Sequence, residues 1–361
     1  MKDEKKIRLL IFVPTLQCGG SEKFISLLCN NINTSKFSIC LAVLQNKNQF
    51  YEITNTAVTV IDIGTSRVSV ALFKIKRLIK QYQPDIVFSA ANHINLYLAI
   101  FRKMFSKNIK FIARESSIVI LNSKNANMPG LYDKLLKKYY KRFDIIVCQS
   151  KYMQQDLVAN YNITADKTVV INNAILPKNV NENLLKQNKE SNKFITVSRL
   201  SPEKGIERLI HAVGLLSIPF EFYIIGSGKQ KAALQKLVTD LDLTKKVFFI
   251  PENKTPFEGM EDADLFLLGS YYEGFPNTLL EAGALGIPAV AFDAAGGIRE
   301  IIENEKNGLL VDDNDIIGFA TAITSALNNK FNRQQIANST VKRFSADKMI
   351  ATVEELFCAI L

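Results

Sequence analysis

The chain alternates short runs of β-branched and apolar residues with longer segments in which apolar residues recur at helical spacing. In the first half, the expected strands are Ile7–Val13, Ser38–Leu44, Val58–Ile61, Asp85–Ser89, Lys110–Ala113, Asp144–Cys148 and Thr168–Ile171. Helices are expected between several of them, around Glu22–Asn31, Leu72–Gln83 and Leu131–Lys141. This alternation predicts a parallel sheet covered by helices.

A polar, Asn-rich stretch over residues 177–193 interrupts the pattern, as a linker would. The alternation then restarts, with expected strands at Phe194–Ser198, Phe220–Ile225, Lys246–Ile250, Asp264–Leu268, Ala289–Phe292 and Gly308–Val311. We therefore expect an α/β protein with two Rossmann-like, doubly wound domains, residues 1–178 and 190–345. Parallel sheets bind ligands beyond the carboxyl ends of their strands, so we expect a site in a cleft between facing domains.

Charge is distributed unevenly between the two halves. Residues 1–190 carry 28 Lys and Arg against 13 Asp and Glu, whereas residues 191–361 carry 17 against 22. A basic first half favours a polyanionic partner such as an anionic bilayer, a lipid diphosphate or a nucleic acid. No reading helix or stacking motif accompanies the basic residues, so we expect no nucleic-acid partner.

Other composition features narrow the chemistry. The five Cys are scattered without a C-x-x-C pair, which predicts reduced, packed thiols in a cytoplasmic protein. The two His residues, His93 and His211, give no metal-binding pattern. The chain contains no run of about eighteen apolar residues, which is the length that a membrane span needs. The apolar run Leu9–Val13 is too short for a signal-peptide core.

The most informative segment, residues 263–293, contains the expected strand–loop–helix sequence EGFPNTLLEAGALG. Pro276 suits the first turn of a helix that should run from Asn277 to about Leu285. The free amides of Asn277, Thr278 and Leu279 would then form an anion site suited to a diphosphate. Glu281 lies one turn further, within reach of a ribose, and Glu273 precedes the helix, within reach of a transferred sugar.

A second segment, SRLSPEKG, follows the strand Phe194–Ser198 and places Arg199 and Lys204 in one Pro-containing turn. A guanidinium and an ammonium suit phosphate oxygens, and they would stabilise the charge on a leaving diphosphate without a metal. Gly19 and Gly20 follow the first strand, and Gly226 follows Phe220–Ile225, where turns would let backbone amides approach a ligand. Gly226-Ser-Gly228 is only a G-x-G, a weak dinucleotide signal.

Two charged patterns need a separate interpretation. Asp262 and Asp264 resemble a metal-binding D-x-D, but they precede a strand rather than follow one, so we expect a structural role and no metal. In the expected helix Leu131–Lys141, five cations share one helix face: Lys134, Lys137, Lys138, Lys141 and Arg142. This basic helix, Lys134–Arg142, is either a solvated face or a docking face for anionic lipid.

Together, E-x7-E around F-P-N, R-x4-K and the N-terminal GGSEK resemble the family 4 retaining glycosyltransferases of GT-B architecture, over nearly the whole chain. The resemblance implies that the C-terminal domain binds a nucleotide sugar and the N-terminal domain an acceptor. It implies that residues 346–361 form a helix crossing back to the first domain. It also implies a metal-independent reaction that retains the anomeric configuration, with the leaving phosphate accepting the acceptor's proton.

The resemblance also assigns roles to single residues. Arg199 and Lys204 would hold the diphosphate, Glu281 the ribose and Glu273 the donor sugar, while Gly19 and Gly20 would close over the phosphates. The implied donor-binding set is Gly19, Gly20, Gly226, Pro251, Glu252, Gly274, Phe275, Pro276, Asn277, Thr278, Leu279 and Glu281.

The sequence departs from the family pattern after the fifth strand of the first domain. Many members carry a His there, whereas this chain reads Ala113-Arg114-Glu115-Ser116. The change resembles a subgroup that acts on polysaccharide or lipid-linked glycans. We expect Glu115 to act in catalysis by orienting the sugar or acceptor, with simple pairing to Arg114 as the alternative.

The resulting expectation is a cytoplasmic enzyme on the inner face of the membrane. It would transfer a hexose or N-acetylhexosamine from a UDP-sugar to a lipid-linked, polysaccharide or lipopolysaccharide acceptor. The alternatives are a GT-B UDP-sugar 2-epimerase, which needs acid and base groups at the sugar, and a non-catalytic nucleotide-binding partner subunit. A nicotinamide oxidoreductase is disfavoured because the chain lacks G-x-G-x-x-G.

Overall fold

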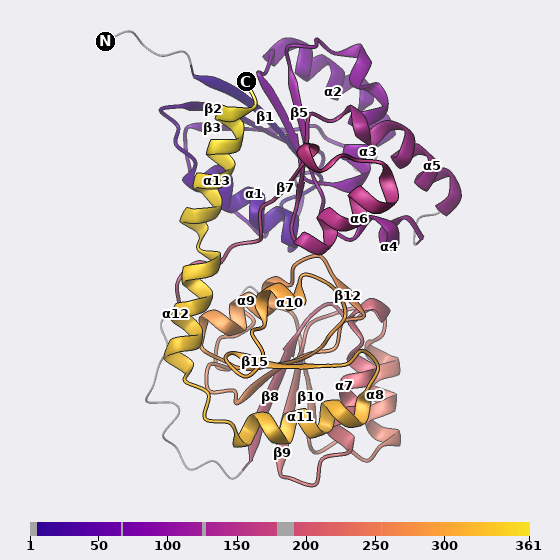
Figure 1. Ribbon diagram of the computed structural model, residues 1–361, viewed down its shortest axis with the longest axis vertical. Helices are drawn as coiled ribbons and strands as arrows, with labels where there is room; N and C mark the ends of the chain where they lie inside the picture. The colour runs from indigo at the N-terminus through magenta and orange to yellow at the C-terminus, as the bar shows by residue number, and fades with distance from the viewer. Residues whose placement is uncertain (1–5, 66–67, 125–127, 179–190, 254) are drawn as a thin grey trace. The chain divides into compact units, whose positions relative to one another are not determined.

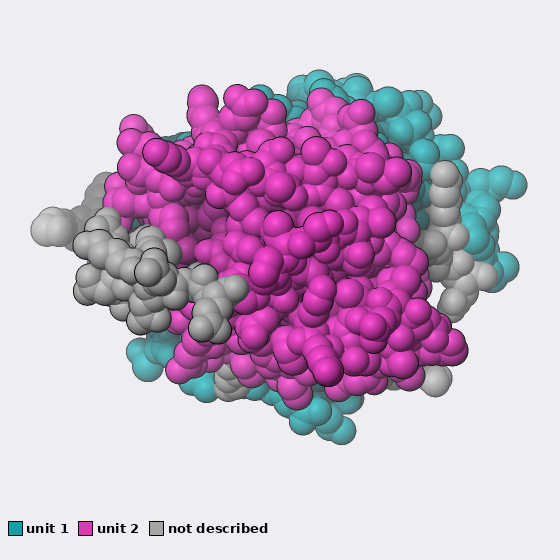
Figure 2. Space-filling view, turned by 90° about the horizontal axis from the view of Figure 1, so that it is seen from below, with its two compact units in different colours: residues 1–173, 346–361 teal, residues 174–345 magenta. Residues whose placement is uncertain are grey.

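The computed structural model describes residues 6–65, 68–124, 128–178, 191–253 and 255–361. The chain forms two compact units, shown in different colours in Figure 2: unit 1 comprises residues 1–173 and 346–361, and unit 2 comprises residues 174–345. Residues 174–178, expected at the end of the first domain, belong to unit 2. The reason is that the Ile175 amide donates to the Phe344 carbonyl at 2.8 Å.

Unit 1 is built on a seven-stranded parallel sheet with the order β3-β2-β1-β4-β5-β6-β7. Figure 1 labels β1, β2, β3, β5 and β7 of this sheet. Its strands are β1 (Ile7–Val13), β2 (Phe37–Val43), β3 (Val58–Asp62), β4 (Ile86–Ser89), β5 (Lys110–Arg114), β6 (Ile145–Cys148) and β7 (Thr168–Val170). Its helices are α1 (Gly20–Asn31), α2 (Val68–Tyr82), α3 (Asn92–Phe101), α4 (Val119–Lys124), α5 (Pro129–Tyr139), α6 (Lys151–Tyr161) and α13 (Ala346–Ala359).

Helix α13, the C-terminal segment, packs on unit 1 although it follows unit 2 in the sequence. Its Phe357 ring is fully buried and meets the rings of Phe37 and Phe88 at centroid distances of 6.1 and 5.6 Å. The Glu354 carboxylate also accepts from the Asn33 amide at 2.7 Å. Aromatic burial of this kind makes the last helix an integral layer of unit 1.

Unit 2 contains a second parallel sheet, with the order β10-β9-β8-β11-β13-β15. Its strands are β8 (Asn192–Val197), β9 (Phe220–Ile225), β10 (Val247–Ile250), β11 (Leu265–Leu268), β13 (Ala289–Phe292) and β15 (Gly308–Val311), with β12 (Tyr272–Glu273) and β14 (Ala295–Gly296) as a small separate pair. Its helices are α7 (Ile206–Gly214), α8 (Lys231–Asp240), α9 (Asn277–Ala284), α10 (Ile298–Ile301), α11 (Ile316–Asn328) and α12 (Arg333–Phe344).

The sheet of unit 2 has a hydrophobic core on each face, which explains the continuous apolar runs of its strands. In β11, Leu265 and Leu267 belong to one core and Phe266 and Leu268 to the other. Successive side chains point to opposite faces, so a strand covered by helices on both sides must be apolar at every position. Both units are therefore Rossmann-like α/β domains, as the alternation of apolar runs predicts.

Candidate active site

The candidate active-site residues of unit 2 gather where the strand order reverses. The chain winds outward from β8 in one direction to β9 and β10 and in the other to β11, β13 and β15. The loops after β8 and β11 therefore leave neighbouring strands at the same edge of the sheet and are free to meet there. In doubly wound sheets this switch point is the usual place for a ligand.

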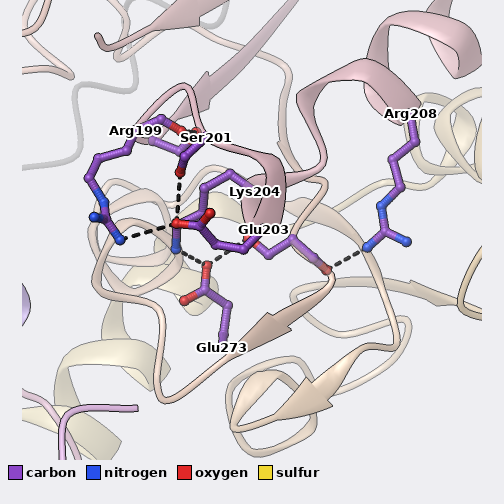
Figure 3. Close-up of polar contacts among 8 residues, drawn as sticks. Arg199, Ser201, Glu203, Lys204, Arg208 and Glu273 are labelled. Atoms are coloured by element: carbon purple, nitrogen blue, oxygen red, sulfur yellow. Dashed lines mark hydrogen bonds and ion pairs between the residues drawn. The ribbon is translucent and has the colours of Figure 1, made fainter. Parts of the chain in front are cut away.

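Lys204 and Glu273 come from these two loops and form an ion pair. The Lys204 Nζ lies 2.6 Å from Glu273 Oε1, and the two side chains are only 18% and 13% exposed (Figure 3). The Ser270 hydroxyl donates to the same carboxylate oxygen at 2.6 Å. Burial limits the movement of the Lys204, Glu273 and Ser270 side chains. The ammonium and the carboxylate are therefore held together at the switch point of the sheet.

Arg199 forms a second, more open ion pair in the same region. Its Nη2 lies 3.3 Å from Glu203 Oε1, and the Ser201 hydroxyl donates to that oxygen at 2.7 Å (Figure 3). The Arg199 side chain is 74% exposed, against 25% for Glu203. Arg199 therefore has the freedom to turn toward a ligand, whereas Glu203 is fixed by its neighbours.

The Gly226 turn packs directly on the loop that carries Arg199. A Cβ at position 226 would lie 1.9 Å from the Ser198 carbonyl oxygen, and φ is +150°, so only glycine fits. The Ser227 hydroxyl donates to Glu252 at 2.6 Å, and the Gly226 amide to the Ile250 carbonyl at 2.9 Å. The structure thus places Gly226 against the Arg199 loop and Glu252 against the Gly226 turn, with Pro251 between Ile250 and Glu252 in the chain.

Helix α9 begins at Asn277, as predicted, with Pro276 as its N-cap and no side-chain hydrogen bond at the cap. Gly274, Phe275, Pro276 and Leu279 are buried, whereas Asn277, Thr278 and Glu281 are partly accessible. The helix start adjoins the loop that carries Glu273. Its amides and positive dipole end favour an anion there.

The short β12–β14 strand pair fixes the backbone of Glu273. Glu273 pairs with Gly296, and the Gly297 amide donates to the Glu273 carbonyl at 3.3 Å. A Cβ at position 296 would lie 1.6 Å from that carbonyl, and the φ of Gly296 is +123°. The segment around Gly296 and Gly297 therefore supports the Glu273 backbone.

Some contributors to this arrangement were not predicted. Arg208 is 3% exposed and donates to the carbonyls of Gly269 and Ser270, while its Nη1 lies 2.7 Å from Asp313 Oδ1. It thereby anchors the loop that presents Glu273. Glu203, also missed, had a signal in the sequence, because it stands four residues after Arg199 at ion-pair spacing.

In unit 1, Gly19 and Gly20 lie at the start of α1. Gly19 is the N-cap residue, with extended backbone at φ −172°, and Gly20 is the first residue of the helix. Glu22 follows in the first turn, and burial raises the pKa of its carboxyl. The loop after β1 lies at the switch point of the first sheet, because β1 pairs with both β2 and β4.

Glu115, expected to orient the sugar or acceptor, is fully buried. Its Oε1 accepts from the Tyr140 hydroxyl at 2.8 Å and from the Asn95 amide at 3.0 Å. Neighbouring Arg114 is also buried, with its guanidinium 3.9 Å from the centroid of the Phe24 ring. Glu115 is thus an interior group of unit 1, and its role in orienting the sugar or acceptor stays a prediction.

The burial of Glu115 predicts a specific pH dependence of stability. Desolvation raises the pKa of Glu115 to about 7, although hydrogen bonds from Asn95 and Tyr140 and the charge of Arg114 oppose the shift. The folded state therefore binds an extra proton between the unfolded pKa and about pH 7. The free energy of unfolding should fall as pH rises through this window and then level off.

Glu115→Gln removes this titration and should be more stable relative to wild type at pH 8 than at pH 5, by about 2 kcal/mol. Urea unfolding at both pH values measures the difference. The exposed Glu52→Gln provides a control that should show no such change. An equal stability difference between Glu115→Gln and wild type at the two pH values would contradict the prediction.

The basic helix begins and ends two residues earlier than predicted. Helix α5 ends at Tyr139, and Tyr140–Arg142 form a 3₁₀ turn in which Arg142 donates to the carbonyls of Ala99 and Ile100. Lys137 pairs with Asp133 at 2.9 Å. Four of the five cations are exposed: Lys137, which is paired with Asp133, and Lys134, Lys138 and Lys141; Met128 and Leu131 in the same segment are also exposed.

The D-x-D pattern is a strand-start contact, as expected. Lys193 Nζ lies 2.6 Å from Asp262 Oδ1, and the Lys193 amide donates to Asp264 at 2.8 Å. Both carboxylates thus tie β8 to the start of β11, at the edge opposite the switch point. Over the described ranges, no helix is long and apolar enough to cross a membrane.

Comparisons with known proteins agree with this architecture. The family model "Glycosyltransferase Family 4" matches residues 19–178, and "Glycosyl transferases group 1" matches residues 178–343. A similar protein of Campylobacter jejuni subsp. jejuni is N-acetylgalactosamine-N,N'-diacetylbacillosaminyl-diphospho-undecaprenol 4-alpha-N-acetylgalactosaminyltransferase. It is 29% identical over 84% of this chain and 86% of its own length.

Solved structures share the fold at low sequence identity. The lipopolysaccharide outer core galactosyltransferase WaaB superposes with a TM-score of 0.78 at 20% identity, covering 98% of this chain and 99% of WaaB. Anabaena HepE in complex with UDP-glucose superposes with a TM-score of 0.78 at 18% identity, covering 98% of this chain and all of HepE.

The two Rossmann-like units define the architecture of the chain as the GT-B fold. Together with the family models and the relatives, they identify the chain as a glycosyltransferase, a transferase of the EC 2.4 class.

Proposed function

We propose that this glycosyltransferase transfers a hexose or N-acetylhexosamine from a UDP-sugar to a lipid-linked or polysaccharide acceptor. The observation that carries the proposal is the convergence of Arg199, Lys204 and Glu273 with the start of α9 at the switch point of unit 2. Anabaena HepE was solved with UDP-glucose, and the Campylobacter relative is named for a diphospho-undecaprenol-linked sugar. Both names support this choice of donor and acceptor.

In the proposed reaction, the bond between the sugar C1 and the diphosphate oxygen breaks, and a bond from C1 to an acceptor hydroxyl oxygen forms. The hydroxyl proton passes to the leaving phosphate, and the anomeric configuration is retained. Lys204 and Arg199 stabilise the charge on the departing diphosphate, so a metal ion is not required. Glu273, fixed by Lys204 and Ser270, binds hydroxyl groups of the transferred sugar.

The rest of the donor-binding set surrounds these groups in the proposal. The amides of Asn277, Thr278 and Leu279 contact a phosphate, and Glu281 accepts from the ribose hydroxyls. The turns at Gly226 and Pro251 contact the nucleoside. Unit 1 binds the acceptor in this proposal, and the role of Gly19 and Gly20 in contacting the donor phosphates stays a prediction.

A panel of nucleotide sugars, with and without lipid-linked and polysaccharide acceptors, tests the proposed function by release of nucleoside diphosphate. Acceptor-dependent release of UDP would support it. Conversion of a UDP-sugar to its 2-epimer without transfer would favour the epimerase, and binding without turnover would favour a non-catalytic subunit.

Glu281→Ala should weaken UDP binding about tenfold or more, the scale expected when a charged hydrogen-bond acceptor is lost. Isothermal titration calorimetry with UDP measures this change. Glu258→Ala, at an exposed carboxylate that accepts from the Thr255 hydroxyl, is the control. Unchanged affinity in Glu281→Ala would remove the ribose assignment.

We also propose that the enzyme works in the cytoplasm on the inner face of the membrane, docking through α5. Exposed Lys134, Lys138 and Lys141 would face anionic lipid, each contributing about 1 kcal/mol, and Met128 and Leu131 would contact the interface. Unit 1 is the basic half of the chain, which fits an anionic partner.

Reversing these three charges (Lys134→Glu, Lys138→Glu and Lys141→Glu) should lower binding to anionic vesicles about 100-fold or more. Flotation with phosphatidylglycerol vesicles at low and high salt measures it, and wild-type binding should weaken with salt. Reversal of exposed Lys229, Lys236 and Lys245 in unit 2 is the matched control. Equal flotation of all three proteins would identify α5 as a solvated face.

A further inference from the structure

We propose that Glu203 is an internal counterion that competes with the donor diphosphate for Arg199 and thereby weakens the binding of donor and product. Glu203 would act through Arg199 as a positioning residue, without contacting the substrate itself. The inference rests on the proposed function, because it requires Arg199 to bind a diphosphate.

The geometry makes Glu203 the fixed partner of the pair. It lies in the 3₁₀ turn Pro202–Lys204, where its carboxylate accepts from the Ser201 hydroxyl and its carbonyl accepts from the Tyr271 amide at 2.9 Å. Arg199 is held by the same carboxylate at 3.3 Å but is 74% exposed. A ligand that captures Arg199 must therefore draw it away from a carboxylate that stays in place.

The electrostatics show that Glu203 stays ionised between two cations. Partial burial raises the pKa of Glu203, but the Ser201 hydrogen bond, its own backbone amide and the charges of Arg199 and Lys204 together lower it below its usual value. Both cations that we assign to the diphosphate thus already act on this carboxylate. With Glu273 paired to Lys204, the four side chains carry no net charge.

The two ion pairs differ in how readily a ligand can separate them. The Lys204–Glu273 pair is short, mostly buried and supported by Ser270, whereas the Arg199–Glu203 pair is longer and largely solvated on the arginine side. Exposed pairs of this kind contribute little to stability, so an arriving phosphate can replace the carboxylate. After transfer, Glu203 can reclaim Arg199 as the nucleoside diphosphate leaves.

Calorimetry with UDP on the full chain tests the competition. Glu203→Gln should bind UDP about fivefold more tightly than wild type, the scale of one exposed ion pair. Glu207→Gln removes the same charge from the adjacent helix, where the carboxylate accepts from the Tyr271 hydroxyl at 2.8 Å, and should leave UDP affinity unchanged. Glu203→Ala is a second variant, which removes any residual hydrogen bond to Arg199.

A double-mutant cycle identifies Arg199 as the mediator. In an Arg199→Ala background, Glu203→Gln should no longer tighten UDP binding. In steady-state turnover, Glu203→Gln should lower KM for the donor without raising kcat, because retained product would oppose any gain. A purely structural role would change stability without this pattern.

The outcomes separate the two proposals. Wild-type protein that does not bind UDP would overturn the proposed function, and the competition with it. UDP binding that weakens in Arg199→Ala but is unchanged or weaker in Glu203→Gln and Glu203→Ala would overturn only the competition. An equal gain of UDP affinity in Glu207→Gln would also overturn the competition, because the effect would then come from the loss of any nearby negative charge.

Discussion

Lys204→Ala should lower kcat at least about 100-fold, the scale reported for losing one group that stabilises transition-state charge. The substitution removes the ammonium assigned to the leaving diphosphate. It also leaves the Glu273 carboxylate, 13% exposed, without its cation. Arg199→Ala should lower kcat to a similar degree through loss of the second cation. Steady-state assays at saturating donor measure both effects.

Lys193→Ala is a matched control for Lys204→Ala. Lys193 is 17% exposed and pairs with Asp262 at 2.6 Å, so its environment resembles that of Lys204, but it lies at the opposite edge of the same sheet. Loss of this pair should affect stability more than turnover. Near-normal kcat in Lys204→Ala, or an equal loss in Lys193→Ala, would remove the role assigned to Lys204.

Gly296→Ala should destabilise unit 2 by about 3 kcal/mol and lower kcat at least about tenfold. The new Cβ would lie 1.6 Å from the Glu273 carbonyl at a φ of +123°, so the Glu273 backbone must move. Misplacement of a reacting or binding group by about 1 Å can cost about 100-fold in rate. Thermal unfolding and steady-state kinetics measure the two effects.

Gly259→Ala separates backbone strain from displacement of Glu273. Gly259 has a φ of +75°, but a Cβ there would meet nothing within 4 Å. It should therefore lose some stability while retaining turnover. If Gly296→Ala and Gly259→Ala had the same kcat, the β12–β14 pair would have no part in placing Glu273.

The fold was largely predictable because its signals are local. The edges of β1, β9, β13 and β15 agree with the expected ranges, since apolar runs in doubly covered sheets are continuous and end at polar turns. The two-residue strands β12 and β14 were missed because such short pairs have no periodicity. Helix α5 was expected to continue to Lys141 because the helical spacing of its residues continues that far. In the structure, Tyr140–Arg142 form a tighter 3₁₀ turn, in which Arg142 donates to the carbonyls of Ala99 and Ile100.

The residues of the candidate site could be predicted from the sequence, but the ion pairs and hydrogen bonds between them could not. Arg199, Lys204 and Glu273 could be selected because each follows an expected strand, where parallel sheets place ligands. The Lys204–Glu273 pair joins residues 69 apart in the sequence, and the burial of Glu115 depends on Tyr140 and Asn95. No local sequence pattern predicts contacts between residues so far apart in the chain.

The sequence by itself determined most of the strands, the two-part architecture and the residue types available at the strand ends, because periodicity and turn chemistry act over a few residues. The tertiary structure decided the strand order and therefore which loops meet. It placed Lys204 against Glu273 and Arg199 against Glu203, and it enclosed Glu115 in the interior. These features depend on long-range packing, in which burial and charge are set by neighbours distant in the chain.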